Sequence, residues 1–291
     1  MSAAVTWRRV ALLVLVATFV LAPALSPHDP AEQFRDHASR PPSCGSPCFP
    51  LGTDELGRDV LSRTLHGGQL SLSAGVGAAS LAVLLGGLLG ALAGAARRWL
   101  DLALSRVVDL LLALPWIYLL IGVRAALPLS VPSDRAYLLT MALLGVLGIG
   151  APFRQARQAV RAARASEPVH AARGLGASER YLLTQHLLPA AVPGLAALWL
   201  MLVPGFVLAE VALSFLGLGI GEPAVSWGTV LAQLRDYPVL VSQWWMFAPV
   251  LALVAFLALL PVRGWSHDPG WLARRARLPA TDRGTHAAPA S

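Results

Sequence analysis

Long apolar runs separated by polar segments are the feature that most constrains this chain. A helix needs about 20 mostly apolar residues to cross the hydrocarbon core of a bilayer, and spanning segments must satisfy their backbone groups internally. The composition agrees, with 56% hydrophobic residues, 13% charged residues and a mean hydropathy of +0.61. The sequence therefore predicts an all-α polytopic membrane protein with six transmembrane helices, at about 10–25, 70–96, 107–123, 136–152, 190–213 and 245–262.

The polar segments divide the chain into three parts. Residues 1–68 hold the first transmembrane helix and an extracytoplasmic segment, residues 69–265 form the main membrane domain, and residues 266–291 form a partly disordered tail. The run at 10–25 also has the length of a signal-peptide core, but Pro23 lies beside the only plausible cleavage position. An uncleaved first helix is the preferred interpretation.

The basic residues set the orientation and exclude several activities. All 23 are arginine, and with no lysine the chain has no phosphate-loop lysine, Schiff-base lysine or lysine general base. With the predicted spans, 16 of the 23 arginines fall on the side that holds both termini and residues 167–189. Since positive charge marks the cytoplasmic face, both termini are predicted inside, and the net charge of +7 reflects topology and not nucleic-acid binding.

Residues 167–189 predict two short helices joined by a tight turn. A helix that begins near Ser166 ends at Gly174 or Gly176, because glycine accepts a left-handed cap. Ser178 then caps a second helix that runs until Pro189 disturbs it. A DNA-binding helix-turn-helix is the competing interpretation. The apolar runs on both sides favour a loop at a membrane surface.

This loop resembles the EAA loop of ABC-importer permeases, on the residues His170, Ala171, Ala172, Gly176, Leu188 and Pro189. The resemblance implies a type I importer fold, in which a cytoplasmic coupling helix docks in a groove of an ATPase subunit. It also implies that ATP and Mg lie on partner subunits and that this chain binds no cofactor. His170 stands where the family has glutamate, so it could only hydrogen-bond when neutral and would repel a basic partner when protonated.

Two further segments resemble the second permease subunit of dipeptide, oligopeptide and nickel importers. One is LGTDELGRDVLSR at 51–63, and the other runs from Glu210 through LSFLGLG to the SWG at 226–228. Asp59 also predicts a helix start, with Val60, Leu61 and Leu65 expected at the membrane edge. The residues that match the two patterns are Gly52, Thr53, Asp54, Gly57, Arg58, Asp59, Glu210, Ser214, Phe215, Gly217, Gly219, Pro223, Ser226 and Trp227.

The resemblance implies the partners and the setting of the chain. It implies a bacterial inner-membrane protein that works with a second homologous permease in a heterodimer, two cytoplasmic ATPase subunits and an extracytoplasmic substrate-binding protein, in contact with membrane lipid. Peptides are the expected substrate, and nickel or another small solute is the alternative. An ion-coupled secondary carrier is a further alternative, disfavoured because the halves show no repeat.

Three further features of the sequence each have two possible interpretations. Ala74, Ala78 and Ala82 continue into Gly86, Gly90 and Gly94 as a stripe of small residues, for packing within the chain or against a second one. Glu210, an acid within an apolar run, has a structural or a gating role. Cys44 and Cys48 form a disulfide or, less plausibly, part of a metal site.

A row of arginines precedes the loop. Arg154, Arg157, Arg161 and Arg164 are expected to meet lipid phosphates or acidic patches on an ATPase.

Overall fold

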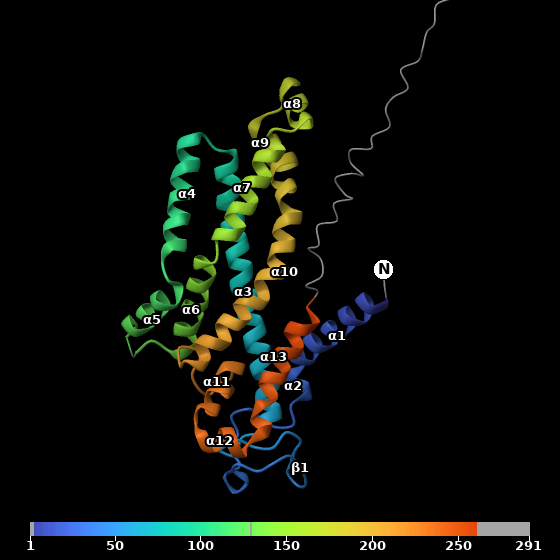
Figure 1. Ribbon diagram of the computed structural model, residues 1–291, viewed down its shortest axis with the longest axis vertical. Helices are drawn as coiled ribbons and strands as arrows, with labels where there is room; N and C mark the ends of the chain where they lie inside the picture. Colours follow the sequence, from blue (N-terminus) through green and yellow to red (C-terminus); the bar gives the residue numbers. More distant parts are fainter. Residues whose placement is uncertain (1–2, 129, 261–291) are drawn as a thin grey trace, which may run out of the picture.

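The computed structural model describes residues 3–128 and 130–260 of the chain. Two long helices run through the bundle, α3 (Val60–Ala95) and α10 (Leu188–Phe215), as Figure 1 shows. At one end lie α8 (Glu167–Gly174) and α9 (Glu179–Leu182). A hairpin of β1 (Ser43–Cys44) and β2 (Cys48–Phe49) lies at the opposite end.

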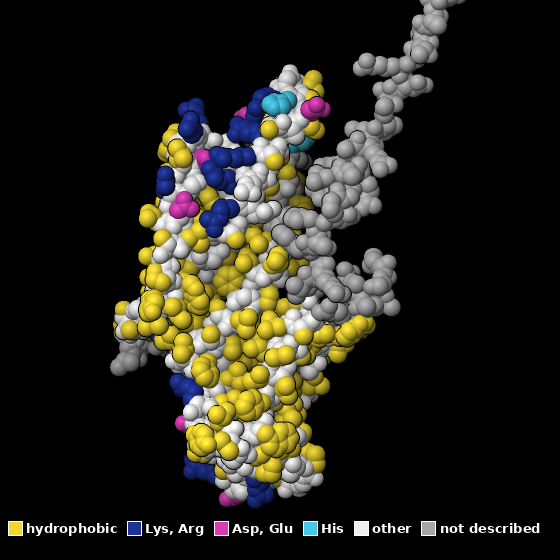
Figure 2. All heavy atoms as spheres, viewed as in Figure 1, with side chains coloured by type: hydrophobic (Ala, Val, Ile, Leu, Met, Phe, Trp, Pro, Cys, Tyr) yellow, Lys and Arg dark blue, Asp and Glu magenta, His cyan; other side chains and the backbone are white. Residues whose placement is uncertain are grey.

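The other helices pack around these two. The remaining elements are α1 (Ala3–Val20), α2 (Ala22–Leu25), α4 (Arg98–Ala113), α5 (Trp116–Ala126), α6 (Ser133–Leu147), α7 (Gly150–Arg164), α11 (Trp227–Ala232), α12 (Tyr237–Ser242) and α13 (Ala248–Leu259), with short turns at Arg35–His37, Leu183–Leu187, Gln233–Arg235 and Trp244–Phe247. Apolar side chains cover the middle of the molecule, while basic ones gather near α4, α7 and α8 (Figure 2). The surface is therefore that of a membrane protein with polar ends.

The described residues hold two to four helical units long and apolar enough to cross a membrane. Val60–Ala95 and Glu179–Phe215 qualify as single helices. The pairs α4 with α5 and α6 with α7 qualify only if each bent pair counts as one span, with bends of 79° and 40°. Val10–Val20 and Trp244–Leu259 are apolar but shorter. A mostly helical, multi-pass architecture is confirmed.

The small-residue stripe of α3 packs within the chain. A methyl group at Gly86 would collide with the carbonyl oxygen of Ile149, and one at Gly90 would collide with the carbonyl of Phe153. Gly94 lies equally close to the backbone of Arg157. The glycines thus let the backbone of α7 lie directly on α3, which confirms the intramolecular interpretation of the stripe.

Several predicted helix boundaries are wrong. The helix expected at 136–152 breaks after Leu147 and continues as α7 to Arg164. The segment 97–106, expected as a loop, is the first half of α4. Because Pro115 lacks an amide hydrogen and restricts the residue before it, α4 ends at Ala113 and α5 leaves at a sharp angle. The helix expected to run from Ser178 to Pro189 does not end there either, since the helical path continues to Phe215 through a π turn at Leu183–Leu187.

Asp59 opens α3 as expected, with its side chain accepting from the amide of Ser62 at 3.0 Å. The expected position of Val60 and Leu65 at the membrane edge is wrong, because both are buried inside the protein. Val60 belongs to an apolar cluster with residues between Val225 and Met246, and Leu65 belongs to the main cluster with Phe19 of α1. These segments cover this end of α3. The predicted end of the sixth helix at residues 261–262 and the tail at 266–291 lie outside the described residues.

Candidate functional site

The predicted coupling loop forms the α8–α9 hairpin at the end of the bundle. Ser166 precedes α8, and the side chain of Ser178 accepts a hydrogen bond from the amide of Tyr181 at 3.3 Å to cap α9. Between the helices, the amide of Ala177 donates to the carbonyl of Ala172 at 3.0 Å. The turn is therefore closed by its own backbone and presents a fixed shape.

Gly176 supplies the left-handed backbone of this turn, with a φ of +86°. No atom of the chain lies within 4 Å of where its Cβ would stand. Gly176 is therefore not confined by other atoms of this chain. Within this chain, glycine is required by the backbone angle and not by a lack of space.

Leu175 lies at the tip of the hairpin and is 90% exposed. His170, Ala171 and Arg173 are also exposed on this hairpin. A leucine this open to solvent on a rigid turn gains free energy only when another molecule covers it. Leu175 was not among the sequence-predicted site residues, because its role depends on its position at the tip and not on its residue type.

The opposite side of the hairpin is anchored in an apolar cluster. Val169 and Leu182 are buried there against Ala156 and Val160 of α7 and Ala91 of α3. Leu188 packs at the edge of the same cluster, whereas Pro189 is exposed. Of the sequence-predicted loop residues, His170, Ala171 and Gly176 are thus exposed, whereas Ala172 is partly buried and packs against this cluster together with Leu188.

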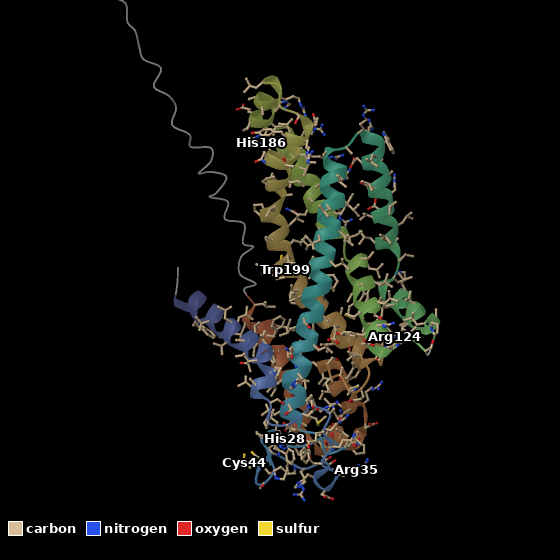
Figure 3. The ribbon with its side chains drawn as sticks, turned by 180° about the vertical axis from the view of Figure 1, so that it is seen from behind. His28, Arg35, Cys44, Arg124, His186 and Trp199 are labelled. Carbon is tan, nitrogen blue, oxygen red and sulfur yellow. The ribbon has the colours of Figure 1, made fainter. Side chains whose placement is uncertain are left out.

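The segment 51–63 forms a buried cap at the other end of the molecule. Asp54 accepts hydrogen bonds from the amide and the Nε of Arg58, at 2.9 and 2.7 Å. Thr53, Asp54 and Asp59 are fully buried. A solvated loop with local ion pairs is therefore the wrong description of these residues. Figure 3 shows Cys44 and His28 at this end, remote from His186 near the hairpin.

The second matched segment, residues 210–228, closes over this cap. Arg124 donates to the carbonyl oxygen of Gly219 at 2.9 Å, and the amide of Gly221 donates to Ser133 at 2.7 Å. Ser226 begins α11 with a capping box, and the indole of Trp227 donates to the carbonyl of Thr64 at 2.9 Å. The segment is therefore fastened to α3, α5 and α6.

Glu222 joins the two matched segments, although the patterns do not include it. Arg58 and Arg63 donate to one of its carboxylate oxygens at 2.8 and 3.1 Å. Trp245 is buried at the same end and donates its indole N–H to the carbonyl of Thr53 at 3.0 Å. The only sequence signal for Glu222 was an acidic residue between apolar runs.

Glu210 is fully buried in α10 and accepts a hydrogen bond from Ser214 at 2.6 Å. Ser71 of α3, Tyr137 of α6 and Ser226 lie near its carboxyl group, whose second oxygen accepts no hydrogen bond from the described residues. The carboxyl group therefore sits where four elements meet, in agreement with a structural role for this side chain.

The remaining predicted residues lie nearby. Gly52, Gly57 and Gly217 have positive φ angles, Gly219 packs against Ser214, Phe215 lies 5.7 Å from the guanidinium of Arg235, and Pro223 is exposed.

Cys44 and Cys48 stand opposite each other across the β1–β2 hairpin, with their sulfur atoms 3.0 Å apart. Both are free thiols. The hydrogen bond from Cys48 to Cys44 raises the pKa of the Cys48 thiol above its usual value.

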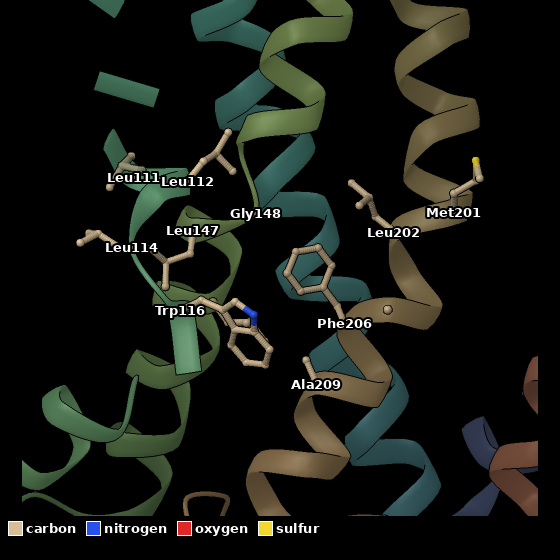
Figure 4. A pocket seen from close by; sticks show the side chains of 12 residues that line it. Leu111, Leu112, Leu114, Trp116, Leu147, Gly148, Met201, Leu202, Phe206 and Ala209 are labelled. Atoms are coloured by element: carbon tan, nitrogen blue, oxygen red, sulfur yellow. The ribbon is translucent and has the colours of Figure 1, made fainter. Parts of the chain in front are cut away.

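A cavity of about 310 Å³ lies midway between the two ends. One wall is formed by residues at the junction of α4 with α5 and at the junction of α6 with α7. The other wall is formed by α10 and includes Gly205 and Phe206. Trp116 and Phe206 point into it from opposite sides (Figure 4). The lining is apolar, so the cavity has no group for chemistry.

A multi-pass helical bundle with a rigid hairpin at one end and a buried polar cap at the other fits a membrane transport component. Residues 86–262 match the family described as the binding-protein-dependent transport system inner membrane component. The chain belongs to this family, whose members are membrane permeases of ABC transporters and work with other transporter subunits.

Named relatives extend the match beyond that region. The chain is 35% identical to the di/tripeptide transport system permease protein DppC of Pseudomonas aeruginosa, over 86% of this chain and 80% of the relative. It is 32% identical to a D,D-dipeptide transport system permease protein, DdpC, of Escherichia coli, over 82% of this chain and 76% of the relative.

Proposed function

We propose that this chain is the second permease subunit of an ATP-driven importer of dipeptides or oligopeptides. The relatives are named for peptide transport, and the likeness covers most of both chains. The observation that carries the coupling role is the α8–α9 hairpin, which presents the exposed Leu175 beyond an anchored base. Such a tip fits a helix-in-groove contact with a second protein.

The proposed topology has six passes with both termini in the cytoplasm. The passes are α1, α3, α4 with α5, α6 with α7, α10, and α13. The hairpin then lies inside, since the arginine-rich side of the chain is the cytoplasmic one. The cap formed by residues 28–63 and 216–247 lies outside, where a substrate-binding protein would dock.

The proposed mechanism is alternating access. A second, homologous permease forms the other half of the pathway, and two ATPase subunits hold the ATP and Mg. Their closure moves the hairpin, and the movement enters the bundle directly because α7 precedes α8 and α9 continues into α10. This chain contributes no catalytic group and acts by binding and moving.

Two measurements test this proposal. Uptake of a radiolabelled dipeptide should be lost when the gene is deleted and restored by the chain together with its partner subunits. Restoration of nickel uptake alone, or uptake driven by a proton gradient without ATP, would refute it.

The orientation is tested by labelling intact cells with a membrane-impermeant maleimide. The native thiols of Cys44 and Cys48 in the unsubstituted chain, labelled after treatment with a membrane-impermeant reductant, serve as the external control. A Leu175→Cys variant in a Cys44→Ser, Cys48→Ser background should stay unlabelled until the membrane is opened. Labelling from outside would reverse the topology.

A further inference from the structure

Three arginines of α7 lie on one helical face and reach the turn between α3 and α4. Arg157, Arg161 and Arg164 are spaced by four and three residues, so they project from the same side of the helix. Arg164 donates to the carbonyl of Ala95, which ends α3. The other two donate to Asp101 in the first turn of α4. We call these three residues the arginine row.

Asp101 is the centre of this contact. Its side chain is only 4% exposed, and Arg157 binds it with two nitrogens, Nε to one carboxylate oxygen and Nη2 to the other at 2.8 Å. Arg161 adds a third hydrogen bond. A two-pronged contact of this kind fixes orientation as well as distance, and its removal would leave guanidinium groups without their anion.

The arginine row also reaches the α8–α9 hairpin. Arg164 donates to Glu179, the first residue of α9, at 3.2 Å, and Arg173 of α8 donates to the same carboxylate at 2.7 Å. Glu179 is 64% exposed, so these pairs are individually weak. They nevertheless place the hairpin and the α3–α4 turn on one face of α7, above the apolar cluster that holds Val169 and Leu182.

We propose that Asp101 is a positioning residue for coupling, which makes the α3–α4 turn move together with the α8–α9 hairpin through the arginine row. The inference rests on the proposed function, because it assigns the hairpin its role in coupling. Without Asp101, a displaced hairpin would move α7 and α10 while α4 stays behind. The ATPase would still dock and hydrolyse ATP, but less of the movement would reach the far side of the bundle.

The same geometry changes the interpretation of the arginines. From sequence they were expected to meet lipid phosphates or acidic patches on an ATPase, whereas the arginine row is engaged by groups of this chain. A lipid-binding role predicts that neutralising Asp101 leaves transport unchanged, because the arginines would then be more available. The positioning role predicts the opposite.

The test uses the complete transporter, reconstituted in vesicles with its ATPases and binding protein. Asp101→Asn keeps the shape but removes the charge, and Asp101→Glu is the conservative rescue. Asp109→Asn is the matched control, since Asp109 lies on the same helix, is 57% exposed and stands 3.9 Å from Arg154. The readouts are dipeptide uptake per ATP hydrolysed and amide hydrogen exchange at residues 95–101 and 167–182.

Asp101→Asn should lower uptake per ATP by about three- to ten-fold, while the ATPase still co-purifies and hydrolyses ATP. Exchange should rise at residues 95–101, and Asp101→Glu and Asp109→Asn should resemble the wild type. Unchanged uptake per ATP hydrolysed would overturn the positioning role. A loss of ATPase binding as large as the loss of uptake would also overturn it, because weaker docking would then explain the effect. If the wild-type chain itself neither binds ATPases nor takes up a dipeptide, the proposed function fails. The exchange data would then still show whether Asp101 holds the α3–α4 turn against the arginine row.

Discussion

The guanidinium of Arg58 donates to the carboxylate of Glu222 at 2.8 Å, across more than half the chain. Arg58 is nearly buried, with 7% of its side chain exposed, and Arg63 donates to the same oxygen at 3.1 Å. Asp54 lies 2.7 and 3.7 Å from the Nε atoms of the same two arginines, so Glu222 adds a second carboxylate to this nearly buried pair. Through it, the segment before α3 and the loop after α10 become one outer cap.

Glu222→Gln should loosen this cap. The amide can still accept hydrogen bonds, Asp54 remains as an anion beside both arginines, and Glu222 is 54% exposed, so we expect a loss of about 0.5 to 1 kcal/mol in stability. A lower thermal midpoint in detergent measures it. Glu55→Gln is the control, because Glu55 is exposed in the same cap. Equal midpoints for both variants would show that Glu222 contributes nothing to the cap.

Gly176→Ala should weaken the α8–α9 hairpin, because a side chain in the left-handed region costs about 1 to 2 kcal/mol. The surrounding space is open, so strain and not collision is the cause. Gly174→Ala is the matched control, as it is helical and equally open, and it should be neutral. Faster amide exchange at residues 170–182 in the first variant only is the expected result.

Gly176→Leu adds bulk to the same strain and should also uncouple uptake from ATP hydrolysis. Normal dipeptide uptake with this variant would remove the hairpin from the coupling path.

Much of the architecture could be predicted because it follows from local chemistry. Ser178 and Asp59 cap helices at the positions that the sequence predicts. The glycines of α3 lie where the backbone of α7 packs against it. Helix lengths were less predictable. The segment 97–106 is polar enough to read as a loop, yet it is helical because Asp101 finds two arginines of α7.

The site was predictable only where a residue type carries the role. The resemblance to permease signatures marked Asp54 and Arg58, and Glu210 was also marked as an acid within an apolar run. It could not mark Glu222 as the common partner of two arginines 159 and 164 residues away, nor Leu175 as the exposed tip. These assignments depend on which segments meet in space.

Cys44 and Cys48 should form a disulfide when the outer face is oxidised. Oxidation needs a disulfide-bearing oxidant outside the cell membrane, which accepts the two electrons as the thiols lose their protons. Thiols that react with maleimide only after reduction are the expected result, and labelling without reduction would refute the bridge.

The reduced pair has a pH dependence of its own. The raised pKa of Cys48 keeps it protonated, so its alkylation should be slow near neutral pH and accelerate as the pH rises. Cys44→Ser replaces the thiol whose hydrogen bond raises that pKa and should shift the profile of Cys48 to lower pH. An identical profile in the variant would contradict this cause.

Glu210→Ala should lower the amount of folded protein more than it alters the choice of substrate. It leaves the hydroxyl of Ser214 without its acceptor and empties a buried position beside α3 and α6, at a cost of about 1 to 3 kcal/mol. Glu210→Gln keeps an acceptor and should recover much of the loss. A normal expression level with changed peptide preference would instead place Glu210 in the pathway.

Leu175→Ser should weaken binding to the ATPase without unfolding the hairpin. At 90% exposure the leucine has almost no contacts to lose within this chain, so any effect must arise in a complex. Removing a leucine from a partner's apolar groove costs about 1.5 to 3 kcal/mol, which corresponds to a ten-fold or greater loss of affinity. Leu56→Ser is the matched control, because Leu56 is 49% exposed in the outer cap. Co-purification with the ATPase should fall for Leu175→Ser alone, while both variants keep the wild-type thermal midpoint, and full retention of the ATPase would mean that the tip is not the docking surface.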